Sequence, residues 1–186
     1  MAQDDVKKRT EEKMKKSIAA LESEFKTIRT GRASAALFER IRVEYYGQKV
    51  PLNQVATISI PEARLVIIQP WDRTVLAEIE KAIQKSELSV NPNNDGKVLR
   101  ISIPPLTEER RRELAKVAKN VAEQSRVAVR NARRDANEEY KGLQKKSDIS
   151  EDQAKRSMEE VQKLTDQFIE QVNNLLESKE KEIMEV

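Results

Sequence analysis

An amphipathic helix near the start of the chain most limits what this chain can fold into. Over residues 4–29, apolar side chains recur three or four residues apart, at Met14, Ile18, Leu21, Phe25 and Ile28. This spacing puts them on one face of a helix. A helix must bury such a face against another element, and the stretch that follows is not helical in character. The partners of this helix must therefore come from further along the chain.

Two more amphipathic helices are predicted after residue 106. The first covers residues 107–144, with Thr107 as its expected N-cap. Its expected apolar face consists of Leu114, Val117, Val121, Ser125, Ala128 and Ala132. Ser150 and Gln153 match a capping box at the start of the second. Its apolar face consists of Met158, Val161, Thr165, Phe168, Val172, Leu175 and Ile183. Three such helices close most simply into one bundle, a rod about 57 Å long at 1.5 Å per residue.

The segment between these helices has the pattern of a small α+β unit. The stretches "IRVEYYGQKV", "VATISI", "RLVIIQ" and "KVLRISI" are β-branched and partly alternating, which predicts strands. Between them "WDRTVLAEIEKAIQKS" predicts a helix with Asp72 as its N-cap. We therefore predict an α+β fold: an elongated three-helix bundle of residues 1–30 and 105–186, with an inserted small β/α/β sandwich domain of residues 31–104.

The chain passes between the two parts at "TGRAS" and "PPLT". Gly31, next to Thr30, can adopt backbone angles that end a helix, and Pro104 and Pro105 keep the approach to the next helix extended. Two short connections at one point form either a rigid junction or a hinge. We favour a hinge made of these four residues.

Charge is distributed unequally between the last two helices. Residues 107–146 contain twelve basic and seven acidic side chains, whereas residues 147–186 contain five and eleven. With Leu114 at zero on a helical wheel, the expected apolar face lies within roughly 60°, and a basic stripe lies between roughly 100° and 200°. The stripe comprises Arg112, Lys116, Lys119, Arg126, Arg130, Arg133, Arg134 and Lys141. It is expected to point away from the bundle, whereas Arg110 falls on the apolar side near the hinge.

Such a stripe is either a solvated face paired with the acidic helix or a surface for nucleic acid. Arginine outnumbers lysine in residues 126–134, and the planar guanidinium suits phosphate. No aromatic residues are interleaved with it, which argues against stacking on single strands. The stripe is therefore predicted to recognise the phosphates and shape of folded RNA.

Composition excludes most kinds of chemistry. The sequence contains neither cysteine nor histidine, so it lacks thiolate ligands, disulfides and the commonest general base. We predict no enzymatic activity, no metal site, no cofactor and no small-molecule substrate. Neither a secretory signal nor an apolar run of membrane-spanning length is present, so we expect a cytoplasmic protein that binds no membrane. Trp71 and the pair Tyr45-Tyr46 either dock a partner or fill the small core, and we favour the core.

Several distinctive motifs occur in order along the whole chain: "IRTGRAS", "VEYYG", "PPLTEERR", "RVAVRNARRDAN", "ISEDQ" and "VQKLTD". Together they resemble the bacterial ribosome recycling factor family. The resemblance implies an L-shaped, hinged translation factor whose three-helix domain binds rRNA of the large ribosomal subunit. It implies that elongation factor G, using GTP, acts with such a factor to separate the subunits and release mRNA and tRNA.

The resemblance also implies which residues contact rRNA. The family's arginines correspond to Arg130 and Arg133, with Arg29, Arg32 and Arg110 as further candidates near the hinge. Trp71 stands where the family is expected to have phenylalanine. We expect a monomer. A general RNA-binding module and a helical adaptor remain the alternatives, the first using the same stripe without a hinge.

Overall fold

The computed structural model describes residues 2–185, and the chain divides into two compact units. The helical unit contains the residues up to Thr30 and those from Glu108 onward, and the inserted unit is Gly31–Thr107. The sequence places the second boundary after Pro104, whereas the structure places it after Thr107. The difference arises because the helix begins at Glu108, so the extended Pro104-Pro105 connection belongs to the inserted unit.

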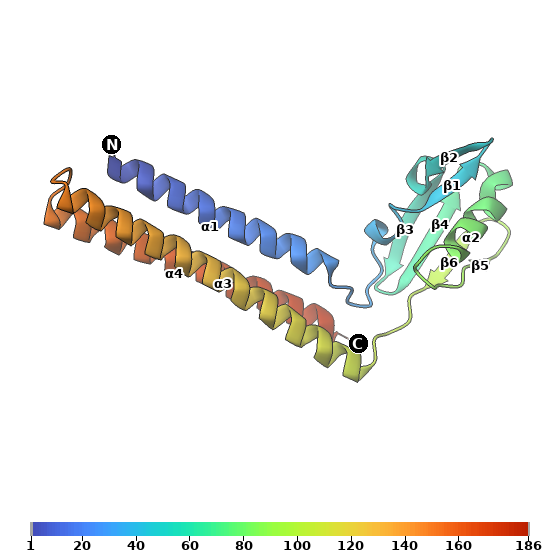
Figure 1. The fold of residues 1–186 in the computed structure, drawn as a ribbon. Coiled ribbons are helices and arrows are strands. Elements are labelled where there is room, and N and C mark those ends of the chain that lie inside the picture. The colour runs from blue at the N-terminus through green and yellow to red at the C-terminus, as the bar shows by residue number, and fades with distance from the viewer. Residues whose placement is uncertain (1, 186) are drawn as a thin grey trace. The chain divides into compact units, whose positions relative to one another are not determined.

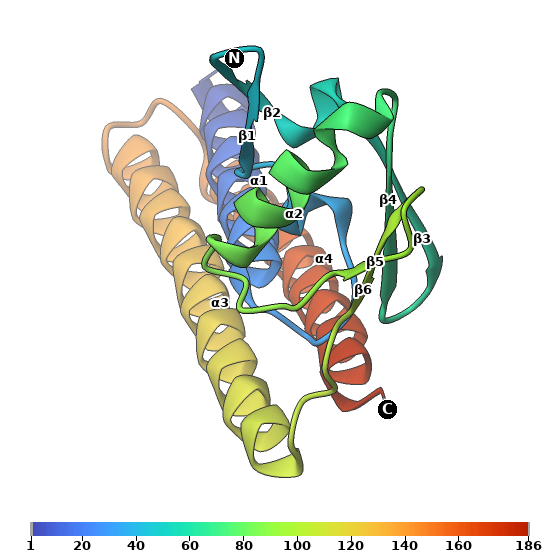
Figure 2. The same ribbon diagram turned by 90° about the vertical axis from the view of Figure 1, so that its right-hand side faces the viewer.

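The helical unit is a three-helix bundle, as predicted (Figures 1 and 2). It consists of α1 (Ala2–Thr27), α3 (Glu108–Lys145) and α4 (Glu151–Met184), and each helix packs against the other two. The five apolar residues predicted for the face of α1 are all buried. The capping box is also confirmed: Ser150 Oγ accepts from Gln153 N, and Gln153 Oε1 accepts from Ser150 N.

The buried face of α3 differs from the predicted one. Val117 and Ala128 are exposed, and the buried residues are Leu114, Ala118, Ala122, Ser125, Val129, Ala132, Ala136 and Tyr140. This face is centred about 40° further round the helix than Leu114. Alanine has almost no side chain to keep neighbouring helices apart, so a row of alanines becomes the contact surface where two helices pack on a third. The sequence interpretation gave valine more weight than alanine.

The inserted unit contains two antiparallel sheets and one helix. Strands β1 (Arg42–Tyr45) and β2 (Gln48–Pro51) form a hairpin, and β3 (Ala56–Glu62), β4 (Leu65–Pro70), β6 (Leu99–Ser102) and β5 (Asn93–Asn94) form the second sheet in that order. Helix α2 (Leu76–Gln84) follows a 3₁₀ turn, Arg73–Val75, whose first N–H groups are capped by Asp72. All these elements except β5 contribute to one apolar core that includes Val43, Ile68, Ile79 and Ile101.

Two aromatic residues of the inserted unit lie at its surface rather than in its core. Tyr46 is 81% exposed and Trp71 is 68% exposed, so the core interpretation is wrong for both. Tyr46 and Gly47 both have positive φ and form the tight turn between β1 and β2, which turns the Tyr46 ring outward. Trp71 Nε1 donates to Thr57 Oγ1 at 2.9 Å. Tyr45 packs against the core as predicted.

The two connections to the helical unit meet at the turn between β3 and β4. Ala33 N donates to Ala63 O, and Ile103 N donates to Arg64 O, at 2.7 and 2.8 Å. Gly31 has a φ of 77°, and a Cβ at this position would lie 3.2 Å from Leu106 Cγ. The positive φ and the close approach of Leu106 both favour glycine here.

The last residue before the first connection is fixed within the helical unit. Thr30 is buried, and its hydroxyl donates to Glu182 Oε1 on α4 at 2.8 Å. Lys179, also buried, donates to the other oxygen of the same carboxylate at 3.3 Å. Helix α4 therefore holds the point at which the chain leaves the helical unit.

Candidate nucleic-acid interface

The predicted basic stripe lies along α3, but its members differ in burial and partners. Arg126, Arg130 and Arg133 are partly buried, and the other members are exposed: Arg112, Lys116, Lys119, Arg134 and Lys141. Arg29, Arg32 and Arg110 near the connections are exposed as well. Burial therefore sets the three arginines on the middle of α3 apart from the rest of the stripe.

Arg133 lies against α4 and does not point away from the bundle, as the sequence interpretation had it. Its Nη1 donates to Gln162 Oε1 on α4 at 2.7 Å. Its Nε is buried and has no hydrogen-bond partner among the described residues. The correction follows from the shifted core of α3. Position 133 is about 60° from the centre of the buried face, which is the flank that meets the neighbouring helix.

Arg126, two turns earlier, makes a similar contact. Its side chain is 19% exposed, and its Nε and Nη2 both donate to Asn173 Oδ1 on α4, at 3.0 and 2.8 Å. Its Nη1 donates to Glu123 Oε2 at 2.9 Å. The guanidinium is thus held on one side by an amide of α4 and on the other by a carboxylate of α3.

Glu123 also binds the third arginine of this group. Arg130 Nη1 donates to Glu123 Oε1 at 3.1 Å. The hydrogen bonds from Arg126 and, second, from Arg130 lower the pKa of the Glu123 carboxyl below its ordinary value, so it is ionised at neutral pH. One carboxylate therefore offsets part of the charge of both arginines, and Arg130 is less available to an anion than the sequence suggested.

Basic residues towards the start of α3 are paired with carboxylates. Arg110 Nη1 lies 2.8 Å from Glu113 Oε2, Arg112 pairs with Glu108, and Lys119 Nζ lies 3.4 Å from Glu180 Oε1 on α4. The expectation that Arg110 falls on the apolar side is wrong, because the buried face of α3 turns in the opposite direction. Exposed pairs of this kind contribute little to stability, and their cations can exchange partners.

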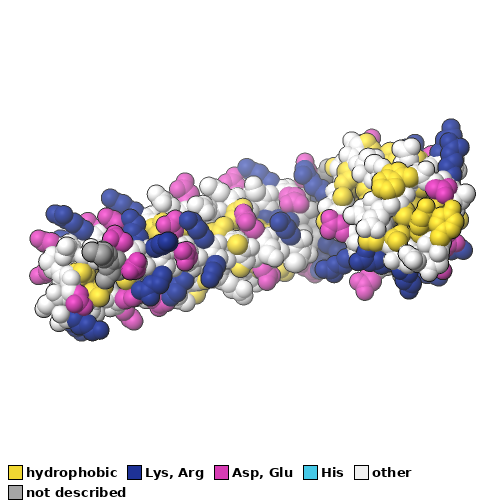
Figure 3. Space-filling view, turned by 90° about the horizontal axis from the view of Figure 1, so that it is seen from above, with side chains coloured by type: hydrophobic (Ala, Val, Ile, Leu, Met, Phe, Trp, Pro, Cys, Tyr) yellow, Lys and Arg dark blue, Asp and Glu magenta, His cyan; other side chains and the backbone are white. Residues whose placement is uncertain are grey.

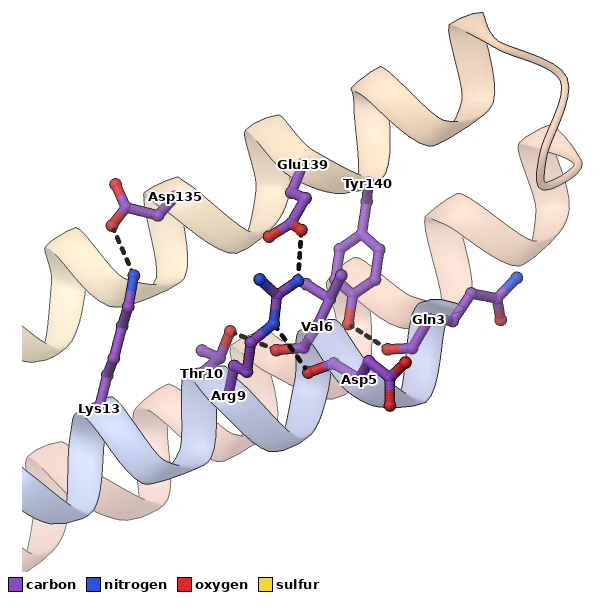
Figure 4. A network of polar contacts seen from close by, with 9 residues as sticks. All are labelled: Gln3, Asp5, Val6, Arg9, Thr10, Lys13, Asp135, Glu139 and Tyr140. Atoms are coloured by element: carbon purple, nitrogen blue, oxygen red, sulfur yellow. Dashed lines mark hydrogen bonds and ion pairs between the residues drawn. The ribbon is translucent and has the colours of Figure 1, made fainter. Parts of the chain in front are cut away.

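The contact between α1 and α3 follows a different pattern (Figure 4). Arg9 Nη2 donates to Glu139 Oε1, and Lys13 Nζ donates to Asp135 Oδ2. In both pairs a cation of α1 meets a carboxylate of α3. Buried Tyr140 lies beside them, and its hydroxyl donates to the carbonyl of Gln3 at 3.3 Å. The charges at this contact are matched within the fold.

Figure 3 shows one face of the molecule on which Lys and Arg of the helical unit are interspersed with Asp and Glu. On this face of the bundle, charge is therefore not divided into a basic and an acidic half. The arginines with neutral partners, Arg133 and in part Arg126, stand out from this mixture. Sequence reasoning missed their partners, Gln162 and Asn173, because neutral side chains give no signal in a count of charges. Placing both helices on wheels facing each other would have been needed to find them.

Residues 2–185 lack two other features that would indicate a function. No group of three or more histidine, cysteine, aspartate or glutamate side chains is placed to hold a metal ion within this range. The helices in the same range include none that is long and apolar enough to cross a membrane.

The family model described as ribosome recycling factor matches residues 21–184. The chain belongs to the ribosome recycling factor family. It is 63% identical over 182 residues to a ribosome-recycling factor of Treponema denticola and 56% identical over 182 residues to that of Carboxydothermus hydrogenoformans. Each alignment covers 98% of this chain and 98% of the relative. The family consists of translation factors and not of enzymes.

Solved structures of the family have the same fold. A solution structure of the ribosome recycling factor is 48% identical, with a TM-score of 0.73 and coverage of 100% of this chain and 99% of that one. A second structure contains the Thermus thermophilus factor with elongation factor G of Escherichia coli, bound to the E. coli post-termination complex. That factor is 47% identical, with a TM-score of 0.63 over 99% of this chain and 100% of that one.

Proposed function

We propose that this chain, with elongation factor G and GTP, splits the post-termination ribosome into subunits and releases mRNA and tRNA for a new round of initiation. In this proposal the basic side of α3 binds rRNA of the large subunit, through Arg126, Arg130 and Arg133 together with the exposed basic residues of the stripe. Because bacterial ribosomes work in the cytoplasm, the chain acts there, and it acts as a monomer.

One observation carries the proposal. A family member 47% identical to this chain over nearly its full length is bound with elongation factor G to the post-termination complex. The arginines on the middle of α3 add physical support, since guanidinium groups bind phosphate through paired N–H donors. The apolar faces of the three helices are buried against one another, which leaves the bundle without need of a second copy.

The connections supply the second part of the proposal. Thr30, Gly31, Pro104 and Pro105 act as a hinge that lets the inserted unit reorient while the helical unit stays bound. Gly31 packs against Leu106 and has to keep its positive φ, so the two connections are best tied to each other through its neighbour, by a disulfide between Thr30→Cys and Leu106→Cys. The natural chain has no cysteine that would interfere. The oxidised protein should bind the large subunit and fail to split ribosomes, and reduction should restore splitting.

Light scattering tests the activity itself. Post-termination ribosomes are mixed with elongation factor G and GTP, with and without this chain. A fall in scattering that requires all three components supports the proposal. Scattering that is unchanged by the chain, with the ribosomes shown to be competent for splitting by another family member, would contradict it. The disulfide form, tested beside its own reduced form, then separates binding from the hinge motion.

A further inference from the structure

We propose that Gln162 is a positioning residue for RNA binding: its neutral amide orients Arg133 at the contact between α3 and α4 without neutralising it. Asn173 orients Arg126 in the same way, through the Nε and Nη2 of its guanidinium. This inference rests on the proposed function, because it names what prepares the arginines of that surface for phosphate. Neither amide belongs to the basic stripe found in the sequence.

The geometry fixes which end of the Gln162 amide faces the arginine. Its Nε2 donates to Asp166 Oδ1, one turn further along α4, at 2.8 Å. The amide oxygen is therefore turned towards Arg133, where it accepts from Nη1 at 2.7 Å. A guanidinium has five N–H groups in a planar fork, and this bond uses one of them. Asp166 anchors the amide from the side opposite to the arginine, so Gln162 acts as a neutral spacer between the two charges.

The same arrangement recurs two turns earlier on α3. Asn173 Oδ1 accepts from both Nε and Nη2 of Arg126, at 3.0 and 2.8 Å. Helix α4 lies in a segment in which acidic side chains outnumber basic ones, eleven to five. Yet where α4 meets these two arginines, it presents amides. Arg126 also pairs with Glu123, so Arg133 is the clearer case and the better target for a test.

An amide and a carboxylate differ in what they do to the charge of an arginine that they bind. Both accept hydrogen bonds from a guanidinium and both fix its plane. A carboxylate also cancels its charge, and a charge already neutralised releases no condensed counterion from RNA when it binds. An amide leaves the full charge available to a phosphate. The contact restricts the Arg133 side chain before RNA binds, so less conformational entropy is lost on binding, and it preserves the positive charge.

A second feature indicates that Arg133 is not at this contact for stability. Its Nε and the Oδ1 of Asn137, one turn further along α3, are both buried and lack hydrogen-bond partners among residues 2–185. A buried polar group without a partner costs free energy. Groups retained at such a cost are found more often at functional sites than elsewhere. The bond to Gln162 therefore leaves part of the Arg133 guanidinium unsatisfied by protein groups among these residues.

The test compares two isosteric changes on α4. Gln162→Glu keeps the shape and can still accept from Arg133, but it adds the neutralising charge and replaces the N–H group that donates to Asp166 with a carboxylate oxygen. Gln167→Glu adds the same charge, also beside Asp166 in the chain, on an exposed position about 140° away on the helix. Binding of each full-length variant to purified bacterial large ribosomal subunits is measured over a series of salt concentrations. Thermal unfolding is recorded alongside.

The inference predicts that Gln162→Glu binds about tenfold more weakly than Gln167→Glu, with a salt slope lower by about one, at a temperature at which thermal unfolding shows both variants to be folded. In an Arg133→Ala background, Gln162→Glu should cause no further loss beyond that of Gln167→Glu in the same background. If the two glutamate variants bind alike while Arg133→Ala binds weakly, Gln162 does not position Arg133 and the inference is overturned. If Arg133→Ala itself binds normally, the RNA surface of the proposed function is overturned with it.

Discussion

Positive charges have different partners at the two contacts that α3 makes, one with α1 and one with α4. Towards α1, the cations Arg9 and Lys13 meet the carboxylates of Glu139 and Asp135 (Figure 4). Towards the middle of α4, Arg133 meets the amide of Gln162 and Arg126 meets that of Asn173. The first side matches each charge within the fold. The second orients its guanidinium groups with neutral amides, so that Arg133, and Arg126 apart from its pair with Glu123, keep positive charge available to a phosphate.

This difference separates residues that hold the bundle together from residues that can bind a polyanion. Both groups are basic and both lie at helix–helix contacts, so a count of charges along the sequence treats them alike. The comparison predicts that removing a charge at the α1 contact affects binding little, whereas removing one at the α4 contact affects binding strongly and stability little. The following variants test that separation.

The largest effect on binding is expected from Arg133→Met, which removes the charge and keeps much of the packing. Binding to the large subunit should weaken by about 1.5–3 kcal/mol, the range for a hydrogen bond to a charged group. The free energy of unfolding should change by no more than about 0.5 kcal/mol, because the lost bond to Gln162 is offset by removal of the unpaired Nε. Equilibrium binding and chemical denaturation measure the two quantities. A strongly destabilised variant would show that Arg133 belongs to the fold.

The α1 side should respond to alkaline pH. Burial, with the nearby carboxylates of Glu160 and Glu139 as the next causes, raises the pKa of the Tyr140 hydroxyl from 10.0 to about 12. The unfolded chain therefore loses this proton first. The resulting stabilisation is complete below pH 10 and is lost as pH rises through about 12, a change of about 2–3 kcal/mol.

Tyr140→Phe isolates that effect from other groups that titrate in the same range, such as lysines. Denaturation of both proteins is measured between pH 8 and pH 12, limits set by the ordinary and raised pKa values. The wild-type protein should lose more stability over this interval than Tyr140→Phe. At neutral pH the variant should be less stable by about 0.5–1.5 kcal/mol, since it lacks the hydrogen bond to Gln3. If the free energies of unfolding of the two proteins fall in parallel as pH rises, Tyr140 is not the source of the stability loss at alkaline pH.

Glu123→Gln should give Arg126 and Arg130 the kind of environment that Arg133 has, with neutral hydrogen-bond partners only. The change replaces the carboxylate that Arg126 and Arg130 share with an amide of the same shape. We expect binding to large subunits to tighten by about threefold, roughly 0.7 kcal/mol, with a steeper salt dependence. Binding measured over a salt series checks this. Weaker binding would mean that Glu123 holds the arginines in their productive orientation, and that its charge matters less than its position.

The smallest effect is expected from the exposed pair of Arg9 and Glu139. A double-mutant cycle with Arg9→Ala and Glu139→Ala should give a coupling of about 0.2–1 kcal/mol in unfolding. None of the three variants should alter binding to the large subunit. A clear loss of binding by Arg9→Ala would extend the RNA surface onto α1 and weaken the distinction between the two sides.

The sequence predicted those features that follow from local rules. The apolar spacing of α1, the capping box at Ser150 and the strands of the inserted unit were all confirmed. Each depends on residues close together in the chain, so the physical cause is visible without the fold.

What the sequence could not predict depends on how helices pack. The alanines at 118, 122 and 136 look neutral in a hydrophobic pattern, but they are buried and shift the buried face of α3 away from the predicted one. That rotation brings Arg133 against α4 instead of into solvent. Gln162 lies 29 positions away in the chain, and a neutral residue at that distance carries no sign of its partner. The arginines were therefore predicted as a set, and their different environments were not.

The salt dependence of binding separates the charges at the α3–α4 contact from those at the α1–α3 contact, because it reports how many phosphates the protein neutralises. Arg133→Ala and Arg9→Ala each remove one positive charge, from opposite sides of α3. We predict that Arg133→Ala lowers the slope of log K against log salt for large-subunit binding by about one, and that Arg9→Ala leaves the slope unchanged. Equal slopes for the two variants would contradict this prediction, because an arginine held by an amide at the α3–α4 contact and one paired with a carboxylate at the α1–α3 contact would then count alike.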